Sequence, residues 1–355
     1  MKSLKDYTMN LPEDKYHRFP AWSYSMIADY AKEGFSAIST IHDAKKPTPS
    51  MEFGSLFDSI LTRGKETLDE YVIDTTGVTP PPAEKEVFDR LITLGFGEYA
   101  YDTLASSHTE SLVEVMNACE SFCSKYKKED TKLANLEKNK AYYDLHRTGK
   151  KVVSKSDWDE AVDMARRFRS DAYLNQLFGT KNTGDVEYLY QAQFLVKFPS
   201  SDGDSIPLKC MFDLLKINHA EKTIQPVDLK TSAMPAYNFA ENFIKFRYDI
   251  QASLYTDILV ETLSHIPEYA DYRVLPFIFA DISRTDKVPV CYVYDPRAKG
   301  QEEGFTYTIK DKTYKCKHWT TLLGEILEYE EHKALVPMGI SLGKPNDLLE
   351  AINRL

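Results

Sequence analysis

The chain has 355 residues and a formal net charge of −10, from 44 basic and 54 acidic side chains. Hydrophobic residues make up 43% of the sequence, which is ordinary for a globular protein and excludes wholesale disorder. The negative balance excludes a protein that coats nucleic acid through bulk positive charge, because that mode needs an excess of lysine and arginine. It leaves open an enzyme that holds DNA in one local channel.

Helical patterns dominate the first half of the chain. Residues 24–64 predict two helices, and a proline-rich loop follows at residues 75–83. The second of these helices has one apolar face, formed by Phe53, Leu56, Phe57, Ile60 and Leu61. Charged helical sequence continues to residue 178, and its last helix is predicted from Ser156 to Gly179.

The pattern changes to strands after residue 184. Predicted strands cover residues 191–198, 208–218, 223–231, 272–281 and 288–295. A helical stretch at residues 236–265 separates the third strand from the fourth, and an amphipathic helix is predicted at residues 318–335. Strands interleaved with helices predict an α/β fold with a helical N-terminal elaboration. No segment is apolar for long enough to span a bilayer, and the N-terminus lacks the core of a signal peptide, so we expect a cytoplasmic protein without membrane contact.

The segment from Lys125 to Lys155 is basic, with ten lysine and arginine side chains against four acidic ones. Tyr126, Tyr142 and Tyr143 are interleaved with these charges, and tyrosine rings can stack on nucleic-acid bases. A solvated helical face explains the same pattern equally well.

Two aspartates and a lysine converge in the segment from residue 211 to 230. A hairpin that turns at Ala220 and Glu221 places Asp213 directly opposite Asp228, and Lys230 then joins them on the same face. We expect Phe212, Leu214, Val227 and Leu229 on the opposite face. Two adjacent carboxylates repel each other unless a cation lies between them, and Mg²⁺ or Mn²⁺ accepts such oxygen ligands. The alternative is a surface hairpin with an ordinary Asp–Lys pair worth less than about 1 kcal/mol.

Gln251 and Tyr255 lie four residues apart, so they share a helix face. An amide and a phenol on one face can bind a phosphate or the edge of a base. The same helix has an apolar stripe at Ile250, Leu254 and Ile258, which is typical of packing against a core.

The order Asp213, Asp228-Leu229-Lys230 and Gln251-x-x-x-Tyr255 resembles the PD-(D/E)xK nuclease superfamily. Within it, the sequence resembles the RecE-like and lambda-exonuclease-like phage recombination exonucleases, of the RecB-like branch that carries the QxxxY helix. The segment Met51–Leu61 resembles the N-terminal motif of that family, with Asp58 where the family usually has a histidine ligand. Glu187 matches a glutamate that many members place near the metal.

The resemblance implies a restriction-endonuclease-like core, in which a central mixed β-sheet is flanked by helices. It implies four segments: 1–74 as the N-terminal helical part of the nuclease fold, 75–183 as a helical insertion with the basic stretch, 184–300 as the core, and 301–355 as a C-terminal hairpin and helix. Asp213, Asp228 and the Leu229 carbonyl are the implied ligands of Mg²⁺ or Mn²⁺, with Glu187 and Asp58 as outer candidates. Lys230 is implied to serve the attacking water, and Gln251 and Tyr255 to position the scissile strand.

The implied activity is a Mg²⁺- or Mn²⁺-dependent DNA exonuclease that digests linear double-stranded DNA from its ends in the 5′→3′ direction. The exposed strand would go to a single-strand annealing protein in phage-type DNA recombination, in the host cell cytoplasm if a phage encodes the chain. Ring-forming relatives imply a homo-oligomer. Two alternatives stay open: an endonuclease or helicase-associated nuclease module of the same superfamily, and a non-catalytic DNA-binding or virion-associated protein on the same scaffold.

Overall fold

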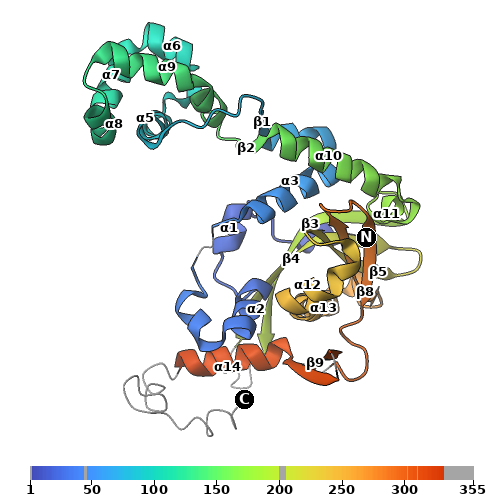
Figure 1. Ribbon diagram of the computed structural model, residues 1–355. Coiled ribbons are helices and arrows are strands. Elements are labelled where there is room, and N and C mark those ends of the chain that lie inside the picture. The colour runs from blue at the N-terminus through green and yellow to red at the C-terminus, as the bar shows by residue number, and fades with distance from the viewer. Residues whose placement is uncertain (1, 44–45, 200–204, 302, 310, 332–355) are drawn as a thin grey trace, which may run out of the picture. The chain divides into compact units, whose positions relative to one another are not determined.

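A six-stranded mixed sheet is the central feature of the computed structural model, which describes residues 2–43, 46–199, 205–301, 303–309 and 311–331 (Figure 1). The strand order is β3-β4-β5-β7-β8, with β6 paired to β5. The strands are β3 Val186–Pro199, β4 Ser205–Asn218, β5 Thr223–Ser232, β6 Arg273–Val274, β7 Phe277–Ser283 and β8 Pro289–Tyr294. β3, β4 and β5 are antiparallel neighbours, β5 and β7 are parallel, and β8 is antiparallel to β7. The expected α/β class with a central mixed sheet is confirmed.

The chain divides into two compact units, and each is described by itself because their relative positions are not determined. The first unit comprises Met1–Thr48 and Phe168–Leu355 and contains the central sheet. The second comprises Pro49–Arg167.

One face of the central sheet is covered by helices that share a large apolar core. The helices of the first unit are α1 Glu13–Arg18, α2 Tyr24–Glu33, α11 Ala172–Leu177, α12 Phe239–Phe246, α13 Tyr248–Ser264 and α14 Trp319–Glu331, with 3₁₀ turns at Leu4–Tyr7, Gly34–Thr40, Ala236–Asn238 and Pro267–Tyr269. The core gathers side chains from β3, β4, β7, α2, α13 and α14, and α12 and α13 form the crossover between the parallel strands β5 and β7 (Figure 1). α13 is buried on nearly every side, which explains its mixture of apolar and small polar residues. A hairpin of β9 Gly304–Ile309 and β10 Lys312–Lys317 precedes α14.

The second unit is mostly helical. Its elements are α3 Pro49–Arg63, α4 Thr67–Glu70, β1 Tyr71–Asp74, α5 Pro82–Thr93, α6 Tyr101–Ser107, α7 Thr109–Asn117, α8 Glu120–Lys125, α9 Glu129–His146, β2 Lys151–Ser154 and most of α10 Lys155–Ser170, with 3₁₀ turns at Gly64–Glu66 and Phe96–Glu98. β1 and β2 form a short parallel pair. Helices α5 to α9 enclose their own core, around Phe88 and Tyr143, which are both fully buried.

Three predicted elements are divided in the structure. The helix expected from Ser156 to Gly179 is two helices, because Asp171 accepts a hydrogen bond from the Leu174 N–H and starts α11. The helix expected at 236–265 is interrupted at Arg247, whose φ of 58° is left-handed. The strand expected at 272–281 is interrupted between β6 and β7.

Two further expectations extend to residues outside the part of the chain that the structure describes. The predicted helix at 318–335 is α14 as far as Glu331, and residues 332–335 lie outside the described residues. The search for membrane-spanning segments, made over the described residues, finds no helix with the length and apolarity to cross a bilayer.

Candidate active site

The hairpin of β4 and β5 has the predicted register. Its paired positions run from Asn218↔Thr223 to Leu214↔Val227, and the turn lies between them at residues 219–222. Asp213 and Asp228 are the next positions beyond the last pair. There the Leu229 N–H donates to Asp213 Oδ2 at 2.7 Å, so a side chain takes the place of a backbone acceptor. The structure therefore brings these two aspartates together at the end of the ladder.

The prediction that Phe212 lies on the face of the hairpin opposite Asp228 and Lys230 is wrong. Its ring packs against Tyr255 on α13, with 5.2 Å between the ring centroids, so it lies on the helix-covered face. The alternation breaks within β4 itself, because Phe212 and Leu215 contribute to the same core although they are three residues apart. The break at Asp213 lies across from Gln191, whose φ of 52° is left-handed and which is skipped in the pairing of the two strands. Leu214 and Val227 are buried away from α13, as expected.

Asp228, Lys230 and Gln251 form one hydrogen-bonded network. Gln251 Nε2 on α13 donates to Asp228 Oδ1 at 2.5 Å, and its Oε1 accepts from Lys230 Nζ at 3.1 Å. Lys230 Nζ also lies 2.7 Å from Asp228 Oδ2 as an ion pair. Asp228 is only 3% exposed, and its Oδ2 makes no contact with hydrogen-bond geometry. The Gln251 amide thus orients both the Asp228 carboxylate and the Lys230 ammonium.

The surroundings keep Lys230 protonated. Burial by itself lowers the pKa of Lys230, but Asp228, followed by Tyr248, Tyr24 and Asp213, raises it well above its ordinary value. Lys230 is therefore a fixed positive charge at neutral pH and a proton donor, and it is not a base.

Two aromatic residues near Lys230 were missed by the sequence analysis. Lys230 Nζ lies 4.4 Å from the centre of the Tyr248 ring, at the first residue of α13. Tyr24, at the start of α2, donates its hydroxyl to the Phe246 carbonyl, and its pKa is raised, chiefly by burial. Tyr248 could have been found as the residue three positions before Gln251, on the same helix face.

A third buried carboxylate, Asp281, was also missed. Asp281 on β7 is the register partner of Lys230 on the parallel strand β5, so both side chains lie on the same face. It is 1% exposed, Ser232 Oγ lies 3.4 Å from its Oδ2, and its Oδ1 has no hydrogen-bond partner. Burial raises the pKa of Asp281 to about 7. The only sequence signal was a single acid within the apolar run of β7.

Tyr255 is a packing residue in this structure. It is 9% exposed, and its ring lies between Phe212 and Phe277 in the core of the first unit. Burial raises the pKa of its phenol well above the ordinary value. Its predicted contact with a nucleic-acid strand stays a prediction.

The structure does not bring Glu187 to the other carboxylates. Glu187 pairs with Ile217, four residues along β3 from the position across from Asp213, which is about 13 Å of extended strand. It accepts a hydrogen bond from Ser3 Oγ, and its Oε2 lies 3.4 Å from His219 Nε2. His219 is half-buried and also pairs with the Tyr272 hydroxyl at 2.9 Å. Glu187 therefore contacts both the N-terminal segment, at Ser3, and the hairpin turn, at His219.

Asp58 lies on α3, in the second unit, and is half-buried. The arrangement of the two units is not determined, so its role as a metal ligand stays a prediction.

The carboxylate pair fits a hard divalent cation that keeps most of its waters. Within the part of the chain that the structure describes, no three histidine, cysteine or acidic side chains are grouped to hold a metal. Mg²⁺ is usually bound through one or two carboxylates plus water, a requirement that half-buried Asp213 and buried Asp228 meet. The carbonyl of Leu229, which follows Asp228 on β5 and donates its N–H to Asp213, is a further oxygen candidate. Softer metals that need nitrogen or sulfur ligands do not fit this donor set.

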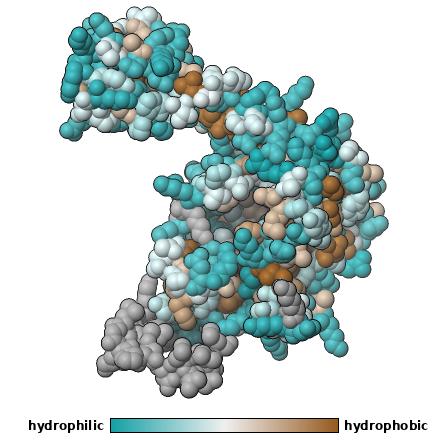
Figure 2. Space-filling view, in the orientation of Figure 1, coloured by the Kyte–Doolittle hydropathy of each residue, from teal (hydrophilic) through white to brown (hydrophobic). Residues whose placement is uncertain are grey.

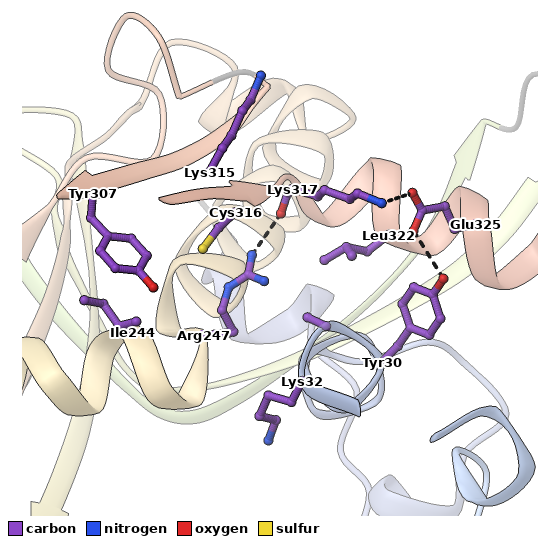
Figure 3. A pocket seen from close by; sticks show the side chains of 11 residues that line it. Tyr30, Lys32, Ile244, Arg247, Tyr307, Lys315, Cys316, Lys317, Leu322 and Glu325 are labelled. Carbon is purple, nitrogen blue, oxygen red and sulfur yellow. Dashed lines mark hydrogen bonds and ion pairs between the residues drawn. The ribbon is translucent and has the colours of Figure 1, made fainter. Parts of the chain in front are cut away.

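A separate cavity of about 430 Å³ lies in the first unit between α2, α14 and β10 (Figure 3). Four cationic side chains line it: Lys32, Arg247, Lys315 and Lys317. Each already has an acidic partner, among them Glu325 at 2.6 Å from Lys317 Nζ. The cavity therefore holds no uncompensated positive charge for an anion.

The tyrosines of the basic stretch, for which stacking on bases was one of two interpretations, pack within the second unit. Tyr143 is fully buried and donates its hydroxyl to the Phe96 carbonyl at 2.6 Å, and Tyr142 is 8% exposed and stacks on His146. Tyr126 is half-buried, and its hydroxyl donates to Glu84. These rings serve the core of the second unit, while hydrophilic side chains dominate the surface of helices α5 to α9 on the face drawn in Figure 2.

No protein-family model matches the chain, and no curated protein matches it in sequence.

Proposed function

We propose that the protein is a Mg²⁺- or Mn²⁺-dependent deoxyribonuclease with a restriction-endonuclease-like core, acting as an exonuclease on the ends of linear double-stranded DNA. The observation that carries the proposal is the network at the end of the β4–β5 hairpin, where Asp213, Asp228, Lys230 and Gln251 meet. An ordinary surface Asp–Lys pair would be exposed and would not be held by a buried amide, so burial supports a chemical role over the surface-pair alternative.

The residues divide the work of phosphodiester hydrolysis between them. Asp213, Asp228 and the Leu229 carbonyl would hold the cation, which, when bound, lowers the pKa of a water molecule and stabilises charge on the phosphoryl group. Lys230 is kept charged by its neighbours and would neutralise the negative charge that develops on the phosphate oxygens. Gln251 would orient the Asp228 carboxylate through its amide N–H and the Lys230 ammonium through its amide oxygen.

The product and partners follow from the resemblance and are part of the same proposal. Digestion in the 5′→3′ direction would leave a single strand for an annealing protein in phage-type recombination. A homo-oligomer in the host cytoplasm is the proposed working form. Negative net charge is compatible with this function because the cation offsets the local carboxylates.

The test compares degradation of linear and closed-circular duplex DNA with Mg²⁺, using wild type and Lys230→Ala. We expect linear DNA to be degraded and circles to persist, and Lys230→Ala to lower the rate by about 10²–10³-fold, the usual cost of removing one charge-stabilising donor. Lys222→Ala is the matched control, because Lys222 is an exposed lysine in the turn of the same hairpin.

Each other result contradicts a defined part of the proposal. Equal cutting of circles would indicate an endonuclease. Full activity of Lys230→Ala would exclude the proposed site. The absence of cleavage by wild type with Mg²⁺, and in a repeat with Mn²⁺, would favour the non-catalytic alternative.

A further inference from the structure

A bound cation would displace the Lys230 ammonium from its present partner, Asp228. The ammonium lies 2.7 Å from Asp228 Oδ2, and Asp228 is one of the two carboxylates proposed to hold the cation. A divalent ion on Asp228 makes the lysine charge redundant there, and the two like charges repel each other across a buried site. Lys230 must then find another acceptor, because a buried ammonium without one is strongly destabilising.

Asp281 is placed to be that acceptor. It is the register partner of Lys230 on the adjacent strand, about 4.8 Å away in the hydrogen-bonding direction, and both side chains lie on the α13 face. Its Oδ1 is buried without a hydrogen-bond partner, and its other oxygen has only the long contact with Ser232. Buried carboxylate oxygens almost always accept a hydrogen bond, so the lack of a donor at Asp281 Oδ1 needs an explanation.

The remaining neighbours of Lys230 do not offer an equivalent. Gln251 Oε1 already accepts from Lys230 and carries no charge, and Tyr248 presents the face of its ring. Around Asp281, the other charged group among the described residues is Asp286, whose oxygens accept from the N–H groups of Ala236 and Val288. Asp286 is thus occupied with the backbone, and its negative charge adds to the effect of burial in raising the pKa of Asp281.

We propose that Asp281 is a positioning residue that receives the Lys230 ammonium when a divalent cation occupies Asp213 and Asp228. The inference rests on the proposed function for the identity of the cation site. It assigns Lys230 two resting places, with Asp228 in the metal-free protein and with Asp281 in the loaded one. Asp281 then lowers the cost of metal binding without touching the metal.

The test measures binding of Mn²⁺ alone to the full-length protein, without DNA, by calorimetry or electron paramagnetic resonance. Asp281→Asn keeps the shape of the side chain and removes its charge, and we expect it to weaken binding by about 10–100-fold, as loss of a supporting carboxylate typically does. Lys230→Met removes the group that needs to move. In that background Asp281→Asn should change the affinity by less than about twofold, because Asp281 acts on the cation only through Lys230 and the two substitutions are therefore coupled.

The control is Asp271→Asn, an exposed carboxylate of the first unit that pairs with Lys222, and its affinity should match that of wild type. Unchanged affinity in Asp281→Asn would overturn the inference. The same loss with and without Lys230 would also overturn it, because Asp281 would then act on the metal directly or through its charge alone. If wild type binds no Mn²⁺, the proposed metal site itself fails, and the inference falls with it.

Discussion

Single residues of the site differ in how far the sequence could reveal them. Asp213 and Asp228 are neighbours because a short turn fixes the hairpin register, so counting along the chain was sufficient. Asp281 comes next to Lys230 only because β5 and β7 pair in parallel across the α12–α13 crossover. No local pattern encodes the register of a parallel pair separated by that length of chain, so this neighbour could not be predicted.

The buried carboxyl of Asp281 predicts a specific pH dependence of stability in the metal-free protein. Burial raises its pKa to about 7 in the folded state, above its ordinary value near 4 in an unfolded chain. The stability that comes from the protonated form is fully present below about pH 4 and is lost as the pH rises through about 7. Wild type should therefore lose stability from pH 5 to pH 8 that Asp281→Asn does not lose, with an upper bound of about 3 kcal/mol over this range, because part of the full ~4 kcal/mol is already lost below pH 5.

Thermal unfolding of both proteins in a chelator, at pH 5 and pH 8, measures this difference. The melting temperature of Asp281→Asn minus that of wild type should increase toward pH 8. Asp185→Asn, an exposed site at the start of β3, should follow wild type at both values. A difference that stays constant with pH would show that Asp281 does not titrate in this range.

Secondary-structure elements were predicted well where side-chain alternation or periodicity is regular, and poorly where one residue breaks it. Gln191 and Arg247 both have left-handed φ values, although neither glutamine nor arginine favours that region. One local and one long-range contact hold Arg247 there: it makes a bidentate pair with Asp249 at 2.9 Å and donates to the Lys317 carbonyl. The contact with Lys317 joins segments that are distant in the sequence, so this support for the break between α12 and α13 could not be seen in the local pattern.

The Arg247–Asp249 pair predicts that the start of α13 depends on one guanidinium. Both side chains are nearly buried, and removing one partner leaves the other as an uncompensated buried charge. Arg247→Ala should lower the free energy of unfolding by about 3–5 kcal/mol. Arg247→Lys should recover only part of this loss, because lysine cannot form the bidentate pair.

Urea unfolding followed by circular dichroism measures both variants. Lys245→Ala, an exposed position in the last turn of α12, is the control and should stay within about 0.5 kcal/mol of wild type. A loss below 1 kcal/mol for Arg247→Ala would mean that the αL turn is stable without the pair.

At the scale of the whole molecule, the described residues include a large hydrophobic core in each unit, and these two cores share no residue. The core around the sheet contains Phe212, and the core of helices α5 to α9 contains Phe88. The helical character of α5 to α9 was visible in the sequence, but which face of each of these helices is buried was not. Tyr142 and Tyr143 looked like rings set among surface charges, and both are core residues, because neighbouring helices cover them.

Separate cores predict that the protein does not unfold in one step. Differential scanning calorimetry should resolve two transitions, because units with their own cores can unfold independently. Phe88→Ala should destabilise the helical unit by about 3–5 kcal/mol and lower one transition, whereas Phe212→Ala should lower the other by a similar free energy. Hydrogen exchange assigns each transition to its helices or strands. Mn²⁺ should raise only the transition that Phe212→Ala lowers, since Asp213 and Asp228 belong to that unit. A single transition that both substitutions and Mn²⁺ shift together would show that the two cores unfold as one cooperative structure.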